Sequence, residues 1–143
     1  MKITTKGRYA LRIFVDLAEH NDGGFVALKD IANRQGISKK YLEQIISSLN
    51  RPNILQVNRG TQGGYKLSRE PSSYTVAEIL ELTDGSFTTP ANNDSDDKKD
   101  GQEDYTAFIW EELRETVTKF LESITIQDIV DRKNSLVGND YVI

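Results

Sequence analysis

The stretch from residue 28 to residue 67 constrains the fold of this chain more than any other part of the sequence. Its first apolar residues have the i, i+3, i+4 spacing of one buried helical face. They are Leu28, Ile31 and Ala32. A turn is predicted at residues 35–38, and Ser38 can cap a second helix through its hydroxyl. The apolar residues of that second helix are Leu42, Ile45, Ile46 and Leu49.

Two short segments follow, residues 55–57 and 65–67, with the alternating pattern of half-buried strands. Between them, residues 59–64 include three glycines in six positions, which favours a tight hairpin and close backbone approach to a ligand. The sequence therefore predicts helix, turn, helix and a two-stranded wing. An ordinary hairpin turn also explains the glycines, but it does not explain Arg59 at the tip.

The second helix has a polar face whose side chains can reach phosphates and base edges. Glu43 can accept from a cytosine amine, and Gln44 can pair with adenine. Lys6 and Arg8, near the N-terminus, can add phosphate contacts. The candidate DNA-binding residues are Lys6, Arg8, Ser38, Lys39, Lys40, Tyr41, Glu43, Gln44, Ser47, Arg59, Gly60 and Thr61. A solvated surface helix is the commoner explanation for a face of this kind.

Charge is divided unequally along the chain. Residues 1–69 hold 12 Lys and Arg against 5 Asp and Glu, a net of +7, whereas residues 70–143 hold 6 against 17, a net of −11. A basic half that carries the helix-turn-helix suggests a nucleic-acid surface on that half only. The acidic half would be repelled from DNA and should lie away from it.

Composition excludes several classes of function. The 143 residues contain no cysteine, which excludes a disulfide framework, a thiol nucleophile and a thiolate metal site. His20 is the only histidine, and neither a catalytic triad nor a phosphate-binding loop is present, so we do not expect an enzyme. No apolar run approaches the ~20 residues of a membrane span. The N-terminus also lacks a signal-peptide pattern, so we expect a cytoplasmic protein.

The segments around this stretch complete a mainly helical (α+β) prediction. A helix is expected over residues 5–20, and short helices over 76–82 and 126–130, each with an acidic third residue as in a capping box. Residues 86–104 read as a flexible acidic loop without the spacing of a calcium-binding EF-hand. The expected divisions are a winged helix-turn-helix domain at 1–85, the loop at 86–104, dimerisation helices at 105–132 and a tail at 133–143.

A longer helix is predicted over residues 105–124, and its apolar residues step by 3, 4, 3 and 4. These residues are Trp110, Leu113, Val117, Phe120 and Ile124. The rhythm is typical of helix pairing, and the small winged domain lacks the surface to cover both this helix and the first one. We therefore expect a homodimer, with packing of the helix on the chain's own core as the alternative.

Four segments carry a family resemblance: residues 1–10, 37–44, 59–65 and 75–85. Together they resemble the Rrf-two family of bacterial winged-helix repressors, over nearly the whole chain. The resemblance implies a homodimeric transcription factor whose long C-terminal helices cross between subunits. Iron–sulfur members of the family carry three cysteines in the loop that matches residues 86–104. Because this chain has none, a cysteine-ligated cluster is excluded and no cofactor is expected.

Within the family, the cysteine-free loop and the segment from Trp110 to Asp128 resemble the branch that represses genes of cysteine metabolism. That resemblance implies cysteine synthase as a partner. The last four residues look like the C-terminal tail by which serine acetyltransferases enter the cysteine synthase active site. The candidate partner-binding residues are Tyr141, Val142 and Ile143. A chance match of four residues is the alternative for the tail taken alone.

The sequence thus favours a dimeric, sequence-specific DNA-binding repressor that recognises an inverted repeat. The alternative is a protein-interaction adaptor that engages an enzyme through its tail and binds DNA weakly or not at all.

Overall fold

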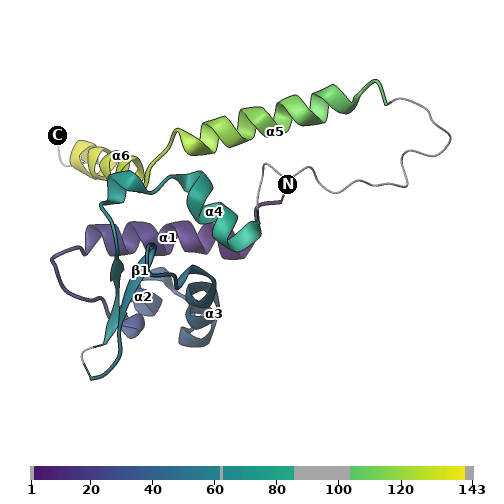
Figure 1. Cartoon of the computed structure of the whole chain (residues 1–143). Helices are drawn as coiled ribbons and strands as arrows, with labels where there is room; N and C mark the ends of the chain where they lie inside the picture. Colours follow the sequence, from purple (N-terminus) through teal and green to yellow (C-terminus); the bar gives the residue numbers. More distant parts are fainter. Residues whose placement is uncertain (1, 62, 86–103, 141–143) are drawn as a thin grey trace.

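The structure is a computed structural model that describes residues 2–61, 63–85 and 104–140 (Figure 1). Its elements are α1 (Thr5–Glu19), α2 (Leu28–Gln35), α3 (Lys39–Leu49), β1 (Leu55–Asn58), β2 (Gly64–Leu67), a 3-10 turn η1 (Pro71–Ser73), α4 (Val76–Asp84), α5 (Ala107–Glu122) and α6 (Ile126–Asp140). The fold is mainly helical with one small sheet, as the sequence predicted. The expected acidic loop, except for Asp104, and the candidate tail residues Tyr141, Val142 and Ile143 lie outside the described residues.

Helix α1 lies at the centre of the main core, where α2, α3, β2, α4 and α6 all contact it. Phe14 is fully buried and meets Tyr74 edge-on, with ring centroids 5.3 Å apart. The Tyr74 hydroxyl donates to the Ile54 carbonyl at 2.7 Å and accepts from the backbone N–H of Ser68 and Arg69. One buried tyrosine therefore ties the wing and the segment after it to the central helix, because its polar end is fully bonded.

The predicted helix-turn-helix is confirmed as α2 and α3. Gly36 ends α2 at φ 67°, a left-handed conformation that favours glycine. The Ser38 hydroxyl accepts from the Tyr41 N–H at 3.1 Å and caps α3. The four apolar residues predicted to face the core from α3 are all at most 2 % exposed. The local periodicity thus decided which face of α3 points outward.

The wing is an antiparallel pair in which Leu55 lies opposite Leu67. Val26 adds one further bridge through mutual hydrogen bonds with Tyr65 at 2.8 and 2.9 Å. A Cβ on Gly64 would lie 2.2 Å from the Val26 carbonyl oxygen. Gly64 therefore serves contact within the protein, between the wing and the segment before α2, rather than approach to a ligand.

Two predictions about the short helices need correction. The Glu78 carboxylate does not complete a capping box on α4, because it binds Arg69 at 2.8 Å instead; Thr75 alone caps the helix. The last helix is not a short one over residues 126–130, because α6 continues to Asp140, through most of the expected tail. Its start does form the reciprocal box, with Thr125 and Asp128 each accepting from the other's N–H.

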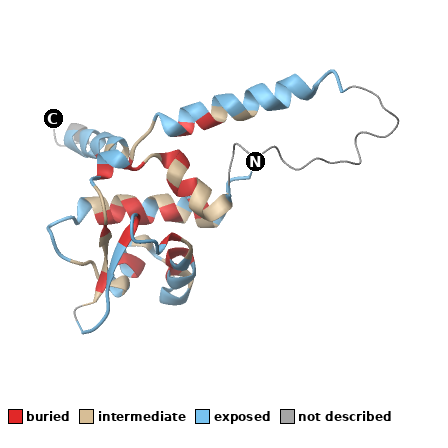
Figure 2. Cartoon of the chain, viewed as in Figure 1, coloured by how far each residue is buried: buried red, intermediate tan, exposed pale blue. Residues whose placement is uncertain are grey.

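Helix α5 packs on the body only through its C-terminal part. Figure 1 shows it leaving the body beside α4, and Figure 2 shows most of its length exposed. Leu121 is buried against the apolar face of α4, while Trp110 and Phe120 are each 61 % exposed. Within the described residues, no helix is long and apolar enough to cross a membrane.

Candidate nucleic-acid interface

The outer face of α3 is polar and accessible. Lys39, Lys40, Glu43 and Gln44 are all exposed, on the side opposite the buried apolar residues. The helix presents two cations in its first turn, then a carboxylate and an amide one turn later. This set can place charge against phosphates and donors and acceptors against base edges.

Three other predicted contact residues have roles inside the protein. The Ser38 hydroxyl caps α3, and the Ser47 hydroxyl donates to the Gln44 carbonyl at 2.7 Å. Tyr41 is half-buried and packs edge-on against Tyr9, with ring centroids 5.7 Å apart. Tyr41 therefore helps to hold the start of α3 against α1. These residues position the interface, and Ser38 and Ser47 remain exposed beside it.

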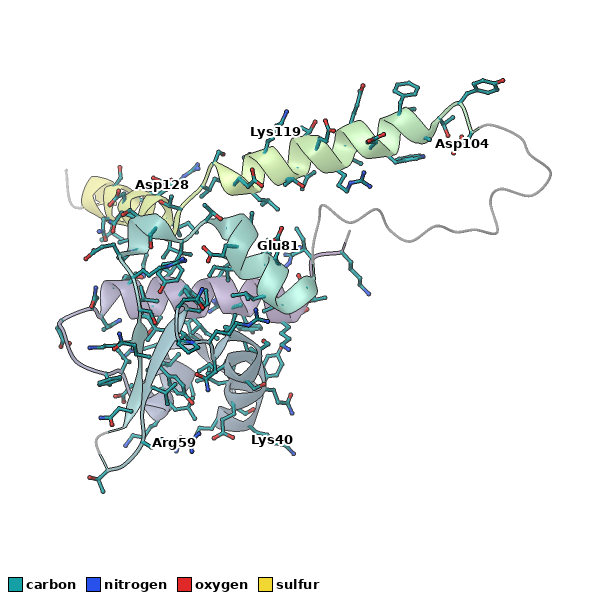
Figure 3. All side chains as sticks on the ribbon, in the orientation of Figure 1. Lys40, Arg59, Glu81, Asp104, Lys119 and Asp128 are labelled. Atoms are coloured by element: carbon teal, nitrogen blue, oxygen red, sulfur yellow. The ribbon has the colours of Figure 1, made fainter. Side chains whose placement is uncertain are left out.

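The wing tip extends beside α3. Arg59, Gly60 and Thr61 are exposed, and Gly60 has a φ of 134° with open space around it. The N–H of Gly63 donates to the Gly60 carbonyl at 3.0 Å and closes the turn. Figure 3 shows Arg59 and Lys40 at the same end of the molecule, away from Asp104 and Lys119 on α5. Basic groups from two separate elements are thus brought to one surface.

Lys6 and Arg8 lie in the first turn of α1. The contact between Tyr9 and Tyr41 places this turn beside the start of α3. Arg8 is exposed and Lys6 is partly exposed. The turn is held by Asp84, whose carboxylate accepts from the backbone and hydroxyl of Thr4, the residue that caps α1. A carboxylate at the N-terminus of α1 also interacts favourably with the helix dipole.

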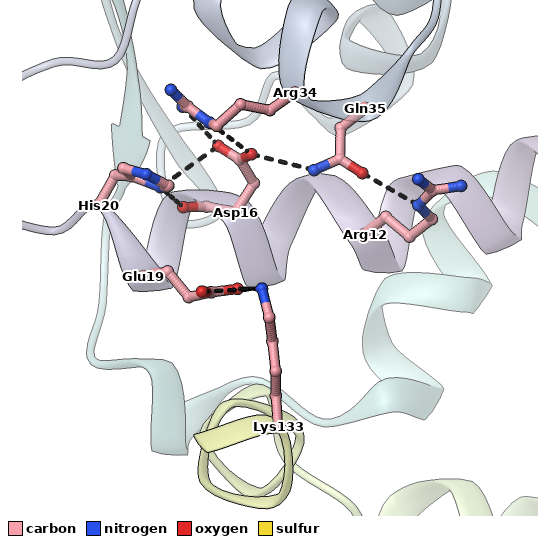
Figure 4. Close-up of polar contacts among 7 residues, drawn as sticks. All are labelled: Arg12, Asp16, Glu19, His20, Arg34, Gln35 and Lys133. Carbon is pink, nitrogen blue, oxygen red and sulfur yellow. Dashed lines mark hydrogen bonds and ion pairs between the residues drawn. The ribbon is translucent and has the colours of Figure 1, made fainter. Parts of the chain in front are cut away.

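A polar cluster that was not predicted from the sequence lies between α1 and α2 (Figure 4). Asp16 is 4 % exposed and accepts two hydrogen bonds from Arg34, at 2.8 and 2.9 Å, and one from Gln35 at 3.0 Å. The side-chain amide oxygen of Gln35, Oε1, in turn accepts from Arg12 Nε at 2.9 Å. A lone acid inside the apolar stripe of α1 was the available signal.

This cluster fixes α2 on α1 with charge as well as packing. Burial by itself raises the pKa of Asp16, but the hydrogen bonds from Arg34 and Gln35 and the charge of Arg34 outweigh it, and the pKa falls below its ordinary value. The bond to Asp16 raises the pKa of Arg34. Both groups are therefore ionised at neutral pH. Arg34 and Gln35 are the last residues of α2 before the turn into α3, so the cluster anchors the end of α2 from which α3 follows.

The five predicted dimerisation residues divide into two groups. Trp110, Leu113 and Phe120 are exposed by 61, 50 and 61 %. Val117 and Ile124 are half-buried against the apolar residues of α4. The exposed group forms an apolar face at the end of the molecule opposite the wing, where the chain itself supplies no cover within the described residues. Large apolar faces of this kind mark interaction sites.

A helix-turn-helix with a basic wing, and an apolar helix at the other end, defines the class of winged-helix DNA-binding regulators. Residues 3–132 match the model of the Rrf2 family, described as iron-dependent transcriptional regulators. The chain belongs to the Rrf2 family and is a transcriptional regulator rather than an enzyme. It is 37 % identical over 136 residues to the HTH-type transcriptional regulator IscR of Xenorhabdus nematophila, a match that covers 95 % of this chain and 83 % of that protein.

Solved structures agree with this assignment. CymR of B. subtilis, described as the global cysteine regulator, aligns with a TM-score of 0.78 and 32 % identity, covering 92 % of this chain and 98 % of CymR. IscR of T. potens aligns with a TM-score of 0.75 and 34 % identity, covering 93 % and 88 %. The chain is thus similar to both CymR and IscR.

Iron in the family description does not fit the ligands that this chain can offer. The sequence has no cysteine and one histidine. The His20 ring nitrogen Nδ1 lies 2.8 Å from the Asp16 carbonyl oxygen. Among the described residues, no group of three His, Cys, Asp or Glu side chains is placed to hold a metal ion. Thiolate ligation of an iron–sulfur cluster requires cysteines, so we assign no role to iron here.

Proposed function

We propose that two copies of this chain bind double-stranded DNA at an inverted repeat and repress the adjoining gene. The observation that carries the proposal is the placement of the basic face of α3 and Arg59 at one end, with the exposed apolar face of α5 at the other. The end with α3 and Arg59 offers charged and polar groups for phosphates and bases, and the apolar face of α5 offers a surface that a second subunit can bury. Two-fold symmetry in the protein then requires two-fold symmetry in the site.

The side chains divide the work of recognition. Lys39, Lys40 and Arg59 supply charge for phosphates, with Lys6 and Arg8 at the edge of the surface. Glu43 and Gln44, which lie one turn into α3, read base edges in the major groove. The acidic α5 and α6 lie away from the DNA, as the division of charge along the sequence requires.

Replacing Arg59 with Ala tests the wing contact. We expect operator affinity to fall by about 1 kcal/mol, roughly fivefold, because one phosphate contact is lost from each wing. The slope of log K against log salt should flatten by about 1.8, since the dimer has two wings. Fluorescence anisotropy titrations of an operator duplex at several salt concentrations measure both quantities.

Lys119→Ala is the control, because Lys119 is exposed on α5 at the far end of the molecule (Figure 3). It should leave both the affinity and the salt slope unchanged. If Arg59→Ala keeps the wild-type operator affinity and the wild-type salt slope, the wing does not contact the DNA.

We further propose that the regulated genes belong to cysteine metabolism and that cysteine synthase is the partner. The similarity to CymR supports the first part. The sequence of residues 140–143 supports the second, because it resembles the tail by which serine acetyltransferases enter the cysteine synthase active site. The alternative, an adaptor that binds the enzyme without reading DNA, rests on the same tail.

Deleting residues 141–143 separates these ideas. We expect the truncated protein to lose binding to cysteine synthase and to keep wild-type operator affinity, because the tail begins after α6 and is distant in sequence from α3. Calorimetry with the purified enzyme and a gel shift with the operator measure the two activities. Enzyme binding that persists after the deletion would show that residues 141–143 are not the binding segment. Enzyme binding by the full-length protein without any operator binding would favour the adaptor.

A further inference from the structure

Arg12 lies on α1 and contacts two residues that lead to the elements of the helix-turn-helix. Its Nε donates to the side-chain oxygen Oε1 of Gln35, the last residue of α2, at 2.9 Å (Figure 4). Its guanidinium carbon lies 5.0 Å from the centre of the Tyr9 ring, within the range of a cation–π contact. One exposed side chain therefore holds the end of α2 and an aromatic ring of α1 at the same time.

The Tyr9 ring extends this contact to α3. It meets the Tyr41 ring edge-on, with centroids 5.7 Å apart and an angle of 87° between the planes. Tyr41 lies in the first turn of α3, where its N–H donates to the capping hydroxyl of Ser38. Aromatic pairs prefer edge-to-face contact, and a Tyr9 ring fixed by the guanidinium offers Tyr41 one defined surface. The contacts of Arg12 thus reach the helix that carries Glu43 and Gln44.

The amide of Gln35 has one orientation that satisfies both of its neighbours. Its oxygen accepts from Arg12, and its Nε2 donates to the buried carboxylate of Asp16 at 3.0 Å. A flipped amide would set its NH₂ group against the Arg12 donor and its oxygen against the carboxylate. Arg12 therefore selects the orientation in which Gln35 binds Asp16. Gly36 follows directly and begins the turn into α3.

A phosphate contact is the other use for an exposed arginine on the helix that carries Lys6 and Arg8. Arg12 forms no ion pair with a carboxylate among the described residues. Its Nε is nevertheless engaged by Gln35, and its guanidinium lies over Tyr9. These contacts orient the side chain within the protein, and the salt dependence of DNA binding separates the two uses.

We propose that Arg12 is a positioning residue for base recognition, which sets the angle of α3 on α1 by holding Gln35 and Tyr9 together. The inference rests on the DNA binding of the proposed function and adds to it a residue that touches no DNA. A small tilt of α3 displaces Glu43 and Gln44 from base edges, where geometry is strict. The flexible side chains of Lys39 and Lys40 still reach phosphates after such a tilt. Sequence discrimination, rather than general affinity for DNA, therefore depends on Arg12.

Arg12→Met tests this role, with an operator duplex and a scrambled duplex of the same length as the two probes. We expect operator affinity to fall about tenfold, the equivalent of one lost base contact, and affinity for the scrambled duplex to fall by less than about twofold. The slope of log K against log salt should stay within about 0.5 of the wild-type value, because no phosphate contact is lost. Fluorescence anisotropy titrations at several salt concentrations measure all three quantities.

Arg8→Met is the matched comparison, because it removes an exposed arginine from the same helix one turn earlier. Arg8 is assigned to a phosphate, so this variant should weaken binding to both duplexes alike. Its salt slope should flatten by about 1.8, one contact in each of two subunits.

Two further measurements test the route through the protein. Arg12→Met combined with Gln35→Met should lose less operator affinity than the two single losses multiplied together, because the residues share one contact. In the free Arg12→Met protein, the amide hydrogens of residues 42–45 should exchange about threefold faster than in the wild type, while those of α4 keep their rates. Nuclear magnetic resonance measures this exchange without any DNA.

Several outcomes would overturn the inference while DNA binding stands. A salt slope that flattens as much as that of Arg8→Met would make Arg12 a phosphate contact. Equal losses on both duplexes would indicate a general loss of folded protein or of charge. Multiplicative losses in the double variant, or unchanged exchange in α3, would break the route through Gln35 and Tyr41. A wild-type protein that binds the operator and the scrambled duplex equally would instead overturn the proposed function itself.

Discussion

Leu113→Asp is expected to convert the proposed dimer into a monomer and to weaken operator binding by at least 100-fold. Leu113 is 50 % exposed at the middle of the apolar face of α5, and it has no cover of its own in the described chain. Burying a carboxylate there is costly, and two-fold symmetry places two of them in one interface. Loss of the second half-site then removes an avidity gain of roughly 10² to 10⁴. Sedimentation equilibrium and operator titration measure the two effects.

Lys119→Asp is a demanding control for this variant. It introduces the same side chain on the polar face of the same helix and changes the charge by more. It should remain dimeric and bind the operator as the wild type does. A Leu113→Asp protein that stays dimeric at micromolar concentration would show that the subunits pair elsewhere.

The parts of the fold that the sequence predicted well are those decided by local pattern. Leu42, Ile45, Ile46 and Leu49 recur at helical spacing, and this spacing alone determined which face of α3 turns outward. Ser38 could be predicted as a cap because the N–H that donates to its hydroxyl, that of Tyr41, lies only three residues away. The wing followed from alternation and glycines in the same way. Each of these features depends on residues that lie close together in the sequence.

The parts that were missed depend on distant residues or on the absence of a pattern. The partners of Asp16 on α2 lie 18 and 19 residues away, so the only local signal was an acidic residue within the apolar stripe of α1. Glu78 fits a capping box by spacing, but Arg69, nine residues away, competes for its carboxylate. Helix α6 runs past Val130 on exposed residues, where only Leu136 and Val137, seven residues after Ile129 and Val130, continue its apolar spacing. The apolar spacing on the outer face of α5 was visible in the sequence, but it could not indicate which surface packs against that face.

Arg34→Met should destabilise the fold by about 3 kcal/mol at pH 7. The substitution leaves the Asp16 carboxylate, 4 % exposed, with Gln35 as its remaining donor from α2, and unpairing a buried charge typically costs ~3–5 kcal/mol. The lower end applies because the Arg34 side chain is 35 % exposed in the wild type. Lys133→Met is the control: it breaks the ion pair with Glu19, in which Lys133 is 55 % exposed, and should cost less than about 1 kcal/mol. Urea unfolding followed by circular dichroism measures both.

The same variant should change how stability depends on pH. In the wild type the pKa of Asp16 lies below its unfolded value, so its contribution is present above that value, about 4, and is lost as pH falls through the folded pKa. Without Arg34, burial remains and the pKa of Asp16 should rise above its unfolded value, so protonation relieves the variant. The difference in unfolding free energy between the two proteins should therefore shrink as pH is lowered from 7 towards 3.5. A difference that stays constant over this range, or one no larger than that of Lys133→Met, would mean that Asp16 and Arg34 do not hold α2 on α1 through their charges.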